Sequence, residues 1–295
     1  MERPPFAFAE PDYPLAPLTR YRVGGPARWA LLPRTIDEAR EAYAWMAAQR
    51  SKGAPVRRFV LGGGSNVLIS DQGLDGVVLV TAALEGMEPL GGDRYRVECG
   101  VELNDLVQDV LLPSNYDGVG GLTGIPGTVG GAIYMNAGTV NGTTCQWVES
   151  VEVAGEGGTR TIAMEPSLYD YRRQSFCPPG DLILQAIFQF RAAETDQRAI
   201  YEHYLQRRRE KQPQGNCCGS VFKNPPNGHA GRLIEACGLK GTRRGGALVS
   251  PVHANFIMND GGATFDDIRS LIRLCQSTVK ERFGVNLERE VVVLD

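Results

Sequence analysis

The 295-residue sequence contains no apolar run approaching the roughly 18 residues that a membrane-spanning helix needs. Residues 1–13 are rich in proline and acidic residues and lack the apolar centre of a secretory signal, so we expect no signal there. The 31 basic and 34 acidic residues give a net charge of −3, which provides no general attraction to nucleic acid or an anionic membrane. We therefore expect no nucleic-acid or membrane partner. A cytoplasmic location and a monomeric state are further expectations.

Residues that hold metals or disulfides are also few. The three histidines, His203, His229 and His253, are far apart and lack the spacing of a zinc site, so no metal is predicted. The seven cysteines are odd in number and scattered, which excludes a disulfide framework and favours a reducing compartment.

Two common phosphate-binding motifs are absent. Gly62 and Gly64 begin a G-x-G-x-x-G pattern, but its third glycine is replaced by Val67. That loop also continues into an apolar strand at 67–69, whereas the motif requires a helix. No G-x-x-x-x-G-K-[ST] sequence occurs. A Rossmann dinucleotide site and a P-loop nucleotidase are both disfavoured.

Glycine, in contrast, is abundant. The 36 glycines are roughly 12% of the chain, against about 7% in average proteins. They concentrate in the triplet 62–64 and in the segment 118–131, half of which is glycine. Consecutive N–H groups in such loops can form an anion-binding nest. Two loops of this kind favour a bound diphosphate cofactor, and a glycine-rich turn system without a ligand is the alternative.

The remaining pattern predicts short strands and helices without regular alternation, which favours an α+β fold over a doubly wound sheet. Thr35 and Glu38 form a capping box that predicts a helix to about Gln49. Helical spacing or composition predicts further helices at 102–112, 195–212, 230–237 and 266–283. Apolar and β-branched runs predict strands at 57–61, 67–69, 77–81, 95–99, 148–153, 159–164, 182–190, 255–258 and 291–294.

Several motifs together resemble one known family. They are LGGGSNVL at 61–68, GLTGIPGTVGGAIYMNAG at 121–138, Tyr171-Arg172, GSVFKNP at 219–225, GLKG at 238–241 and LEREV at 287–291. Their order and identity are similar to those of the UDP-N-acetylenolpyruvoylglucosamine reductase (MurB) family, over roughly residues 18–295. The short link between Phe190 and the arginines at 207–209 has no room for a substrate-covering tyrosine loop, which indicates the type II form.

The resemblance implies a fold and a domain division. Residues 1–194 would form an α+β FAD-binding domain of the vanillyl-alcohol-oxidase (PCMH) type, in two lobes of about 1–80 and 81–194. Residues 195–295 would form a smaller α+β substrate-binding domain. The glycine-free window at 181–214 agrees with a last strand and a helix that lead from one domain into the next.

The resemblance also implies a cofactor and a reaction. FAD would bind without a covalent link, and NADPH would reduce it and leave. The enolpyruvyl ether of UDP-N-acetylglucosamine would then accept a hydride from flavin N5 at its methylene carbon, and protonation would give UDP-N-acetylmuramate. Residues matching the family's pyrophosphate loop are Gly62, Gly63, Gly64, Ser65 and Asn66. Residues matching its cofactor-lining segment are Gly127, Gly130, Gly131, Asn136 and Gly138.

The catalytic residues that the resemblance implies suit this chemistry. Arg172 would stabilise the enolate charge, because a guanidinium is a permanent and rigid cation. Ser220 would donate the proton, and Glu290 would orient or relay protons. Asn224 and Lys240 would meet the diphosphate of the substrate. Arg173 competes with Arg172 for its role, and Gln174 stands where the family usually has serine.

Two other functions are compatible with the sequence. The first is a different FAD-dependent oxidase or dehydrogenase of the same fold. Many members of that class attach FAD through a histidine, but no histidine precedes His203 here. The second is a nucleotide-sugar-binding protein without catalysis, which the presence of Arg172, Ser220 and Glu290 disfavours.

Overall fold

The computed structural model describes residues 2–50, 57–226 and 228–295. The chain forms two compact units, and both are discontinuous in sequence. Unit 1 comprises Met1–Asp12, Arg28–Gly63 and Asp75–Gln206, and unit 2 comprises Tyr13–Ala27, Gly64–Leu74 and Arg207–Asp295. These units are defined by compactness, whereas the predicted boundary between residues 194 and 195 separates FAD binding from substrate binding. That boundary stays a prediction.

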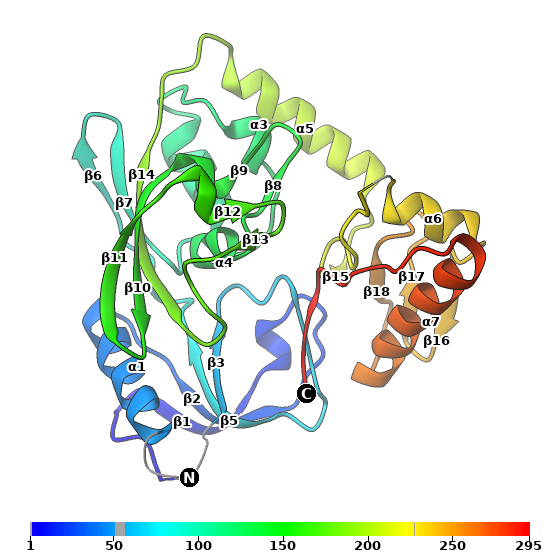
Figure 1. Cartoon of the computed structure of the whole chain (residues 1–295), viewed down its shortest axis with the longest axis horizontal. Helices are drawn as coiled ribbons and strands as arrows, with labels where there is room; N and C mark the ends of the chain where they lie inside the picture. The colour runs from blue at the N-terminus through cyan, green and yellow to red at the C-terminus, as the bar shows by residue number, and fades with distance from the viewer. Residues whose placement is uncertain (1, 51–56, 227) are drawn as a thin grey trace. The chain divides into compact units, whose positions relative to one another are not determined.

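Two larger sheets form the frame of unit 1 (Figure 1). One has the strand order β1-β2-β5-β3, in which β3 and β5 run parallel. The other has the order β11-β10-β14-β7-β6 and is antiparallel. Their strands are β1 Ala9–Pro14, β2 Pro26–Leu31, β3 Arg57–Leu61, β5 Leu74–Val80, β6 Met87–Gly91, β7 Arg94–Glu98, β10 Val148–Gly155, β11 Gly158–Ala163 and β14 Leu182–Gln189.

Helix α1, Ile36–Arg50, confirms the predicted capping signal. The Glu38 N–H donates to Thr35 Oγ1 (3.2 Å), and the Arg34 N–H donates to the Glu38 carboxylate (2.7 Å). The helix lies beside β10 and β14 in Figure 1 and contacts both strands. Its buried side carries Tyr43 and Met46, so the predicted helix is held by apolar packing on the second sheet.

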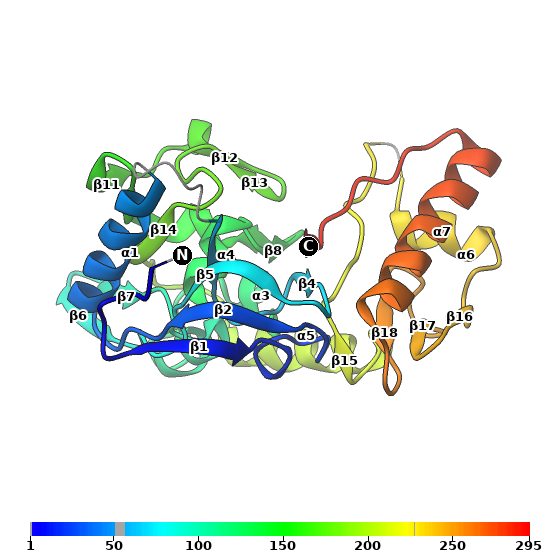
Figure 2. The same cartoon turned by 90° about the horizontal axis from the view of Figure 1, so that it is seen from below.

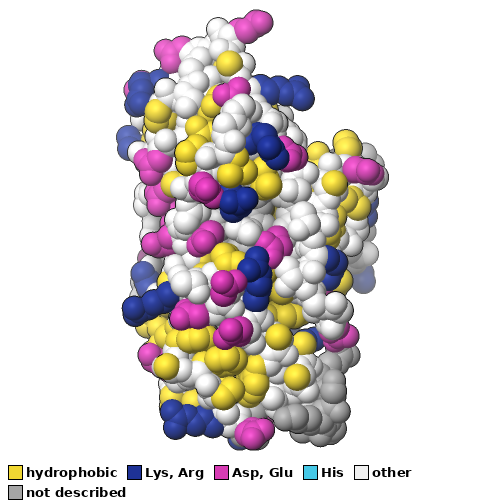
Figure 3. All heavy atoms as spheres, turned by 90° about the vertical axis from the view of Figure 1, so that its left-hand side faces the viewer, with side chains coloured by type: hydrophobic (Ala, Val, Ile, Leu, Met, Phe, Trp, Pro, Cys, Tyr) yellow, Lys and Arg dark blue, Asp and Glu magenta, His cyan; other side chains and the backbone are white. Residues whose placement is uncertain are grey.

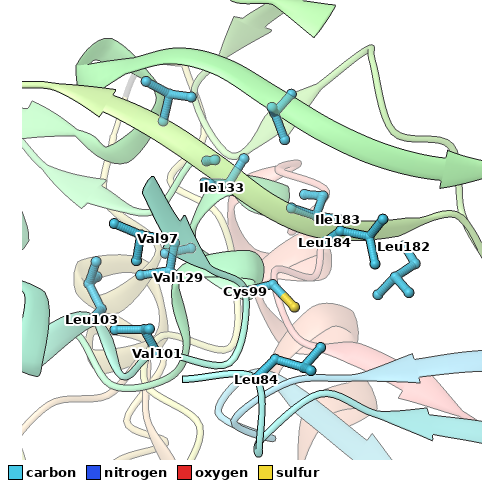
Figure 4. Close-up of a cluster of buried hydrophobic side chains, with 14 of the residues drawn as sticks. Leu84, Val97, Cys99, Val101, Leu103, Val129, Ile133, Leu182, Ile183 and Leu184 are labelled. Atoms are coloured by element: carbon cyan, nitrogen blue, oxygen red, sulfur yellow. The ribbon is translucent and has the colours of Figure 1, made fainter. Parts of the chain in front are cut away.

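Short elements connect these layers. The predicted helix at 102–112 is present as α2, Leu103–Asp105, followed by a π-helical turn, Leu106–Leu111. The others are α3 Val119–Leu122, α4 Val129–Tyr134, β8 Gly138–Thr139, β9 Gly142–Thr143, β12 Tyr169–Asp170, β13 Arg173–Gln174 and α5 Gln197–Lys211. Figure 4 shows how Val97, Cys99, Val129 and Ile133 meet in the core beside β14. This packing anchors the second glycine-rich segment.

Unit 2 contains a sheet with the order β15-β18-β17-β16. Helix α7, Phe265–Phe283, lies beside β16, β17 and β18 and contacts α6, Ala230–Ala236 (Figure 2). Thr264 caps α7 through a capping box with Asp267, and Gly284 ends it in a left-handed conformation. The strands of this sheet are β15 Asn216–Cys217, β16 Arg243–Arg244, β17 Ala247–Val249 and β18 Ile257–Asn259.

A parallel pair of strands completes unit 2. Strand β4, Val67–Ile69, pairs with β19, Val292–Leu294, so that the residues after the glycine triplet lie beside the end of the chain. The pairing is in register, with Val67 opposite Val292 and Ile69 opposite Leu294. Both strands lie close to their predicted positions, but the sequence did not predict that they pair with each other.

The surface carries charges of both signs (Figure 3), as the nearly balanced numbers of basic and acidic residues indicate. Figure 3 shows basic and acidic side chains interspersed on the face in view. Within the described residues, no helix combines the length and apolarity needed to span a bilayer. Nor do His, Cys, Asp and Glu side chains gather there in a group that could hold a metal.

Candidate active site

The predicted pyrophosphate loop, residues 62–66, joins β3 to β4. Gly63 packs directly on the second glycine-rich segment, because a Cβ on Gly63 would lie only 2.9 Å from the Gly127 Cα. Gly64 has a φ of +57°, and a Cβ there would lie 1.9 Å from the Leu18 carbonyl oxygen. Both positions exclude larger residues. The two glycine-rich segments predicted to bind the cofactor are therefore in contact.

Thr128 lies at this contact and was missed by the sequence analysis. Its side chain is 2% exposed, and its hydroxyl has no hydrogen-bond partner among the described residues. A Cβ on Gly62 would lie 2.6 Å from the Thr128 Oγ1. Although Thr128 immediately precedes α4, its hydroxyl does not cap the helix. A buried hydroxyl without a partner costs free energy, so its position between two glycine segments indicates a ligand group.

The glycines of α4 divide into two roles. A Cβ on Gly130 would lie 2.7 Å from the Cys99 Cβ, and the Gly130 N–H donates to the Cys99 carbonyl (2.8 Å). Gly130 therefore allows α4 to pack on the core. Gly131 has only the Thr128 Oγ1 near its Cβ position, at 3.8 Å. Of these two predicted cofactor residues, Gly131 has the open face and Gly130 the packed one.

The side chain of Arg172 lies against the second glycine-rich segment. Arg172 occupies the turn between β12 and β13 with a φ of +54°, a strained conformation for a side chain of this kind. Its guanidinium donates to the carbonyl oxygens of Gly138 (2.8 Å) and Asn136 (3.4 Å). The structure thus brings together the candidate catalytic arginine and two predicted cofactor residues.

The next two residues of the hairpin, Arg173 and Gln174, make contacts within the hairpin and the turn that follows it. Arg173, the competing arginine, is 73% exposed and forms an ion pair with Asp170 (2.8 Å). A hydrogen bond from the Tyr171 N–H, followed by the charge of Arg173, lowers the pKa of Asp170. The Gln174 side chain accepts from the Phe176 and Cys177 N–H groups and donates to the Cys177 carbonyl, so it holds the following turn. Arg172 is the better candidate for catalysis.

In unit 2, Ser220 precedes a segment that is held from two sides. The side chain of Asn255 accepts from the Phe222 N–H (3.0 Å) and donates to the Phe222 carbonyl (2.8 Å). On the other side, the Glu290 N–H donates to the Val221 carbonyl (2.8 Å). Ser220 and Glu290, two predicted catalytic residues from distant parts of the chain, therefore lie on adjacent backbone segments. Asn255 therefore supports the segment after Ser220, and the sequence analysis did not identify it.

Asn66 joins this group through its side chain. Its Nδ2 donates to the Glu290 carbonyl (2.9 Å), and its own carbonyl accepts from the Val292 N–H (3.0 Å). Ser65 is half-buried in the same loop. The predicted pyrophosphate loop and the Glu290 segment are thus linked by hydrogen bonds within unit 2. Glu288, in contrast, is exposed and pairs with Lys223 (2.6 Å).

The two predicted substrate residues lie at opposite ends of α6. Asn224 Oδ1 accepts from the N–H of Ala230, the first residue of the helix (3.1 Å). Lys240 Nζ pairs with Glu235 (2.8 Å), near the last turn. Burial, followed by the charge of Lys240, lowers the pKa of His253. Lys240 is 30% exposed and remains accessible to an anion.

The chain matches two family descriptions. Residues 27–163 match an FAD binding domain, and residues 211–294 match the UDP-N-acetylenolpyruvoylglucosamine reductase C-terminal domain. An FAD-binding domain of the expected α+β type joined to this second domain defines a flavin-dependent oxidoreductase. Relatives that align with nearly the whole chain show which family of flavin-dependent oxidoreductases it belongs to.

Proteins named UDP-N-acetylenolpyruvoylglucosamine reductase from Prochlorococcus marinus and Caldicellulosiruptor bescii are 41% and 36% identical to this chain. The alignments cover 96% and 95% of this chain and 92% and 88% of those proteins. The crystal structure of the reductase from Thermus caldophilus has a TM-score of 0.77 at 35% identity, over 96% of this chain and 97% of that one. The chain belongs to the UDP-N-acetylenolpyruvoylglucosamine reductase family, which serves peptidoglycan synthesis.

FAD is the cofactor, and the residues of unit 1 fit it. The unpartnered Thr128 hydroxyl needs a polar group from a ligand. The open face of Gly131 leaves space beside that hydroxyl. Backbone N–H groups in glycine-rich loops suit a diphosphate, because no Cβ prevents its approach. Within unit 1, Gly62, Gly63, Thr128 and Gly131 would hold the group.

Proposed function

We propose that the protein is an NADPH-dependent flavoenzyme that reduces UDP-N-acetylglucosamine enolpyruvate to UDP-N-acetylmuramate. FAD, once reduced by NADPH, supplies the hydride that adds to the methylene carbon of the enolpyruvyl ether. The protein then manages charge and one proton at the adjacent carbon. We further propose that it acts as a cytoplasmic monomer, with residues 1–194 binding FAD and residues 195–295 binding substrate.

Arg172 would stabilise the charge that develops during hydride addition. Addition to the methylene carbon pushes electron density through the neighbouring carbon to the carboxylate, which gives an enolate. A guanidinium already held on the Gly138 carbonyl needs little reorganisation as this charge grows. Because a guanidinium is a permanent cation, this stabilisation would persist across the working pH range.

Ser220 would give its hydroxyl proton to the enolate carbon. A serine hydroxyl is a weak acid, but an adjacent enolate is a strong enough base to accept its proton. Glu290, on the adjacent segment, would orient the hydroxyl or return a proton to it from solvent. Lys240 and Asn224 would bind the diphosphate of the UDP group, the lysine by charge and the asparagine by its amide.

One observation carries this proposal beyond family membership. Asn66, Val221 and Glu290 come from three distant segments, yet hydrogen bonds of 2.9 and 2.8 Å join them within unit 2. The segments that carry the predicted proton donor, its predicted partner and Asn66 of the predicted pyrophosphate loop are therefore neighbours within unit 2, which supports the proposal.

The decisive experiment separates the two half-reactions without oxygen. The purified protein should be yellow, with FAD released on denaturation, and NADPH should bleach it. Adding UDP-N-acetylglucosamine enolpyruvate should then restore the flavin absorption and yield UDP-N-acetylmuramate. Reduced flavin that stays bleached with this substrate, but is reoxidised by oxygen, would instead support a different FAD-dependent oxidase or dehydrogenase. A protein that binds the substrate without any colour change would support a binding role.

A further inference from the structure

Asn136 connects two parts of unit 1 through its side chain. It is 2% exposed and lies between α4 and β8 with a φ of +42°, a conformation that asparagine tolerates better than most residues. Its Oδ1 accepts from the Cys145 N–H (3.1 Å), and its Nδ2 donates to the Asp170 carbonyl (2.9 Å). Both polar atoms of this predicted cofactor residue therefore bond within the protein.

The bond to Asp170 reaches the hairpin that carries Arg172. Asp170 is the last residue of β12, two positions before Arg172. The guanidinium of Arg172 returns to the Asn136 carbonyl (3.4 Å) and to the Gly138 carbonyl (2.8 Å). Asn136 thus contacts the hairpin twice, through its amide to the backbone and through its own carbonyl to the guanidinium.

The neighbouring polar side chains stabilise the hairpin itself. Arg173 pairs with Asp170 across the two strands, and Gln174 binds the backbone at residues 176 and 177. These bonds keep the shape of the hairpin. The Asn136 amide instead joins the hairpin to the segment that follows α4, so it fixes where the turn and its arginine lie.

We propose that Asn136 is a positioning residue that aligns Arg172 for hydride addition, an inference that rests on the proposed function. A left-handed turn residue on a short hairpin has considerable freedom unless a second segment holds it. The amide supplies that restraint next to the predicted cofactor segment. Misplacement of a catalytic group by about 1 Å can slow a reaction roughly 100-fold, so a single buried hydrogen bond suffices for a large effect.

Two substitutions remove the bond to Asp170, and the first of them keeps the bond to Cys145. Asn136→Asp keeps an oxygen for the Cys145 N–H but places an acceptor against the Asp170 carbonyl. Asn136→Gly removes the side chain and tolerates the positive φ, so it carries the test if the aspartate variant does not fold. Thr144→Val is the matched control, because the buried Thr144 hydroxyl donates to the Ala137 carbonyl in the same segment (2.9 Å) without touching the hairpin.

The measurements are FAD affinity, bleaching by NADPH and recovery of colour with UDP-N-acetylglucosamine enolpyruvate. We expect both Asn136 variants to bind FAD and to react with NADPH within about threefold of the parent, while colour recovery slows roughly 10- to 100-fold. Thr144→Val should change colour recovery by less than about threefold. FAD affinity falling as far as colour recovery would overturn the inference and assign Asn136 to the cofactor.

A double variant tests whether the effect passes through Arg172. If Asn136 acts by placing the guanidinium, adding Asn136→Gly to Arg172→Lys should slow colour recovery by less than about threefold beyond Arg172→Lys alone. Fully additive losses would overturn the inference. The parent protein distinguishes this outcome from failure of the proposed function, since without colour recovery in the parent the proposed function itself is wrong.

Discussion

Replacing Asn255 by alanine should destabilise unit 2 by an amount that follows from its contacts. Asn255 is 4% exposed and its side chain satisfies both the N–H and the carbonyl of Phe222, which is itself 1% exposed. Alanine leaves these two backbone groups buried without partners, while the bond from the Val221 N–H to the Asn255 carbonyl survives. Each orphaned group costs about 1–3 kcal/mol, so with partial relaxation the free energy of unfolding should fall by about 3 kcal/mol.

This loss can be measured by urea unfolding of the FAD-saturated protein. With a slope of roughly 2–3 kcal/mol per molar urea, the midpoint of the transition that includes unit 2 should fall by about 1–1.5 M. Far-UV circular dichroism is the appropriate signal, because Trp29, Trp45 and Trp147 all lie in unit 1.

A matched control is Gln189→Ala. The Gln189 amide also donates to backbone carbonyls, those of Gly92 (3.0 Å) and Phe190 (3.1 Å), but its side chain is only partly buried, so water can replace these bonds. This variant should shift the midpoint by less than about 0.4 M. Equal shifts for the two variants, or almost none for Asn255→Ala, would refute the argument that buried amide bonds hold the segment after Ser220.

Four further outcomes are expected. Ser220→Ala should leave NADPH bleaching nearly intact while substrate-driven colour recovery falls by about 100-fold or more; equal loss in both half-reactions would contradict a proton-donor role. Lys240→Ala should raise the substrate KM about tenfold with little change in kcat, and an unchanged KM would remove Lys240 from the diphosphate site. Arg172→Lys should slow colour recovery by about 10- to 100-fold, whereas Arg173→Lys should be nearly neutral; the reverse order would make Arg173 the catalytic arginine. Iodoacetamide at pH 8 should modify the half-buried Cys237 first, and rapid modification of the others would show that they are accessible. Burial raises the pKa of five other thiols to about 12, those of Cys99, Cys145, Cys177, Cys218 and Cys275. At pH 8 only about one in 10⁴ of these thiols is a reactive thiolate.

Local sequence patterns predicted the regular elements well. The capping signal of α1 and the strands β10 and β11 depend on residues a few positions apart, and the structure confirms them. At 102–112 the apolar spacing correctly placed a helix but not its π-helical turn. Spacing reports which face is buried, whereas the number of residues in a turn depends on what that face packs against.

The site was predictable only in part. Motif resemblance named Arg172, Ser220 and Glu290. In the structure the Arg172 guanidinium contacts the glycine-rich segment, and Ser220 and Glu290 lie on adjacent backbone segments. Thr128 and Asn255 gave no such signal, because an unpartnered hydroxyl or a buried amide is defined by distant neighbours. Sequence analysis predicted Asn66 and Asn136 as cofactor residues, and their amides bond to the carbonyls of Glu290 and Asp170.

The pairing of β4 with β19 has a consequence for how the protein is made. Val292 leaves the ribosome 225 residues after Val67 (292 minus 67), which at about 5–20 residues per second is a delay of roughly 10–45 seconds. During that time β4 has an apolar strand edge and no partner, so a nascent chain exposes a surface that favours misassociation. Residues 292–294 therefore provide the partner of the strand that follows the loop beginning at Gly62, and a chain truncated just before Val292 would lack that partner.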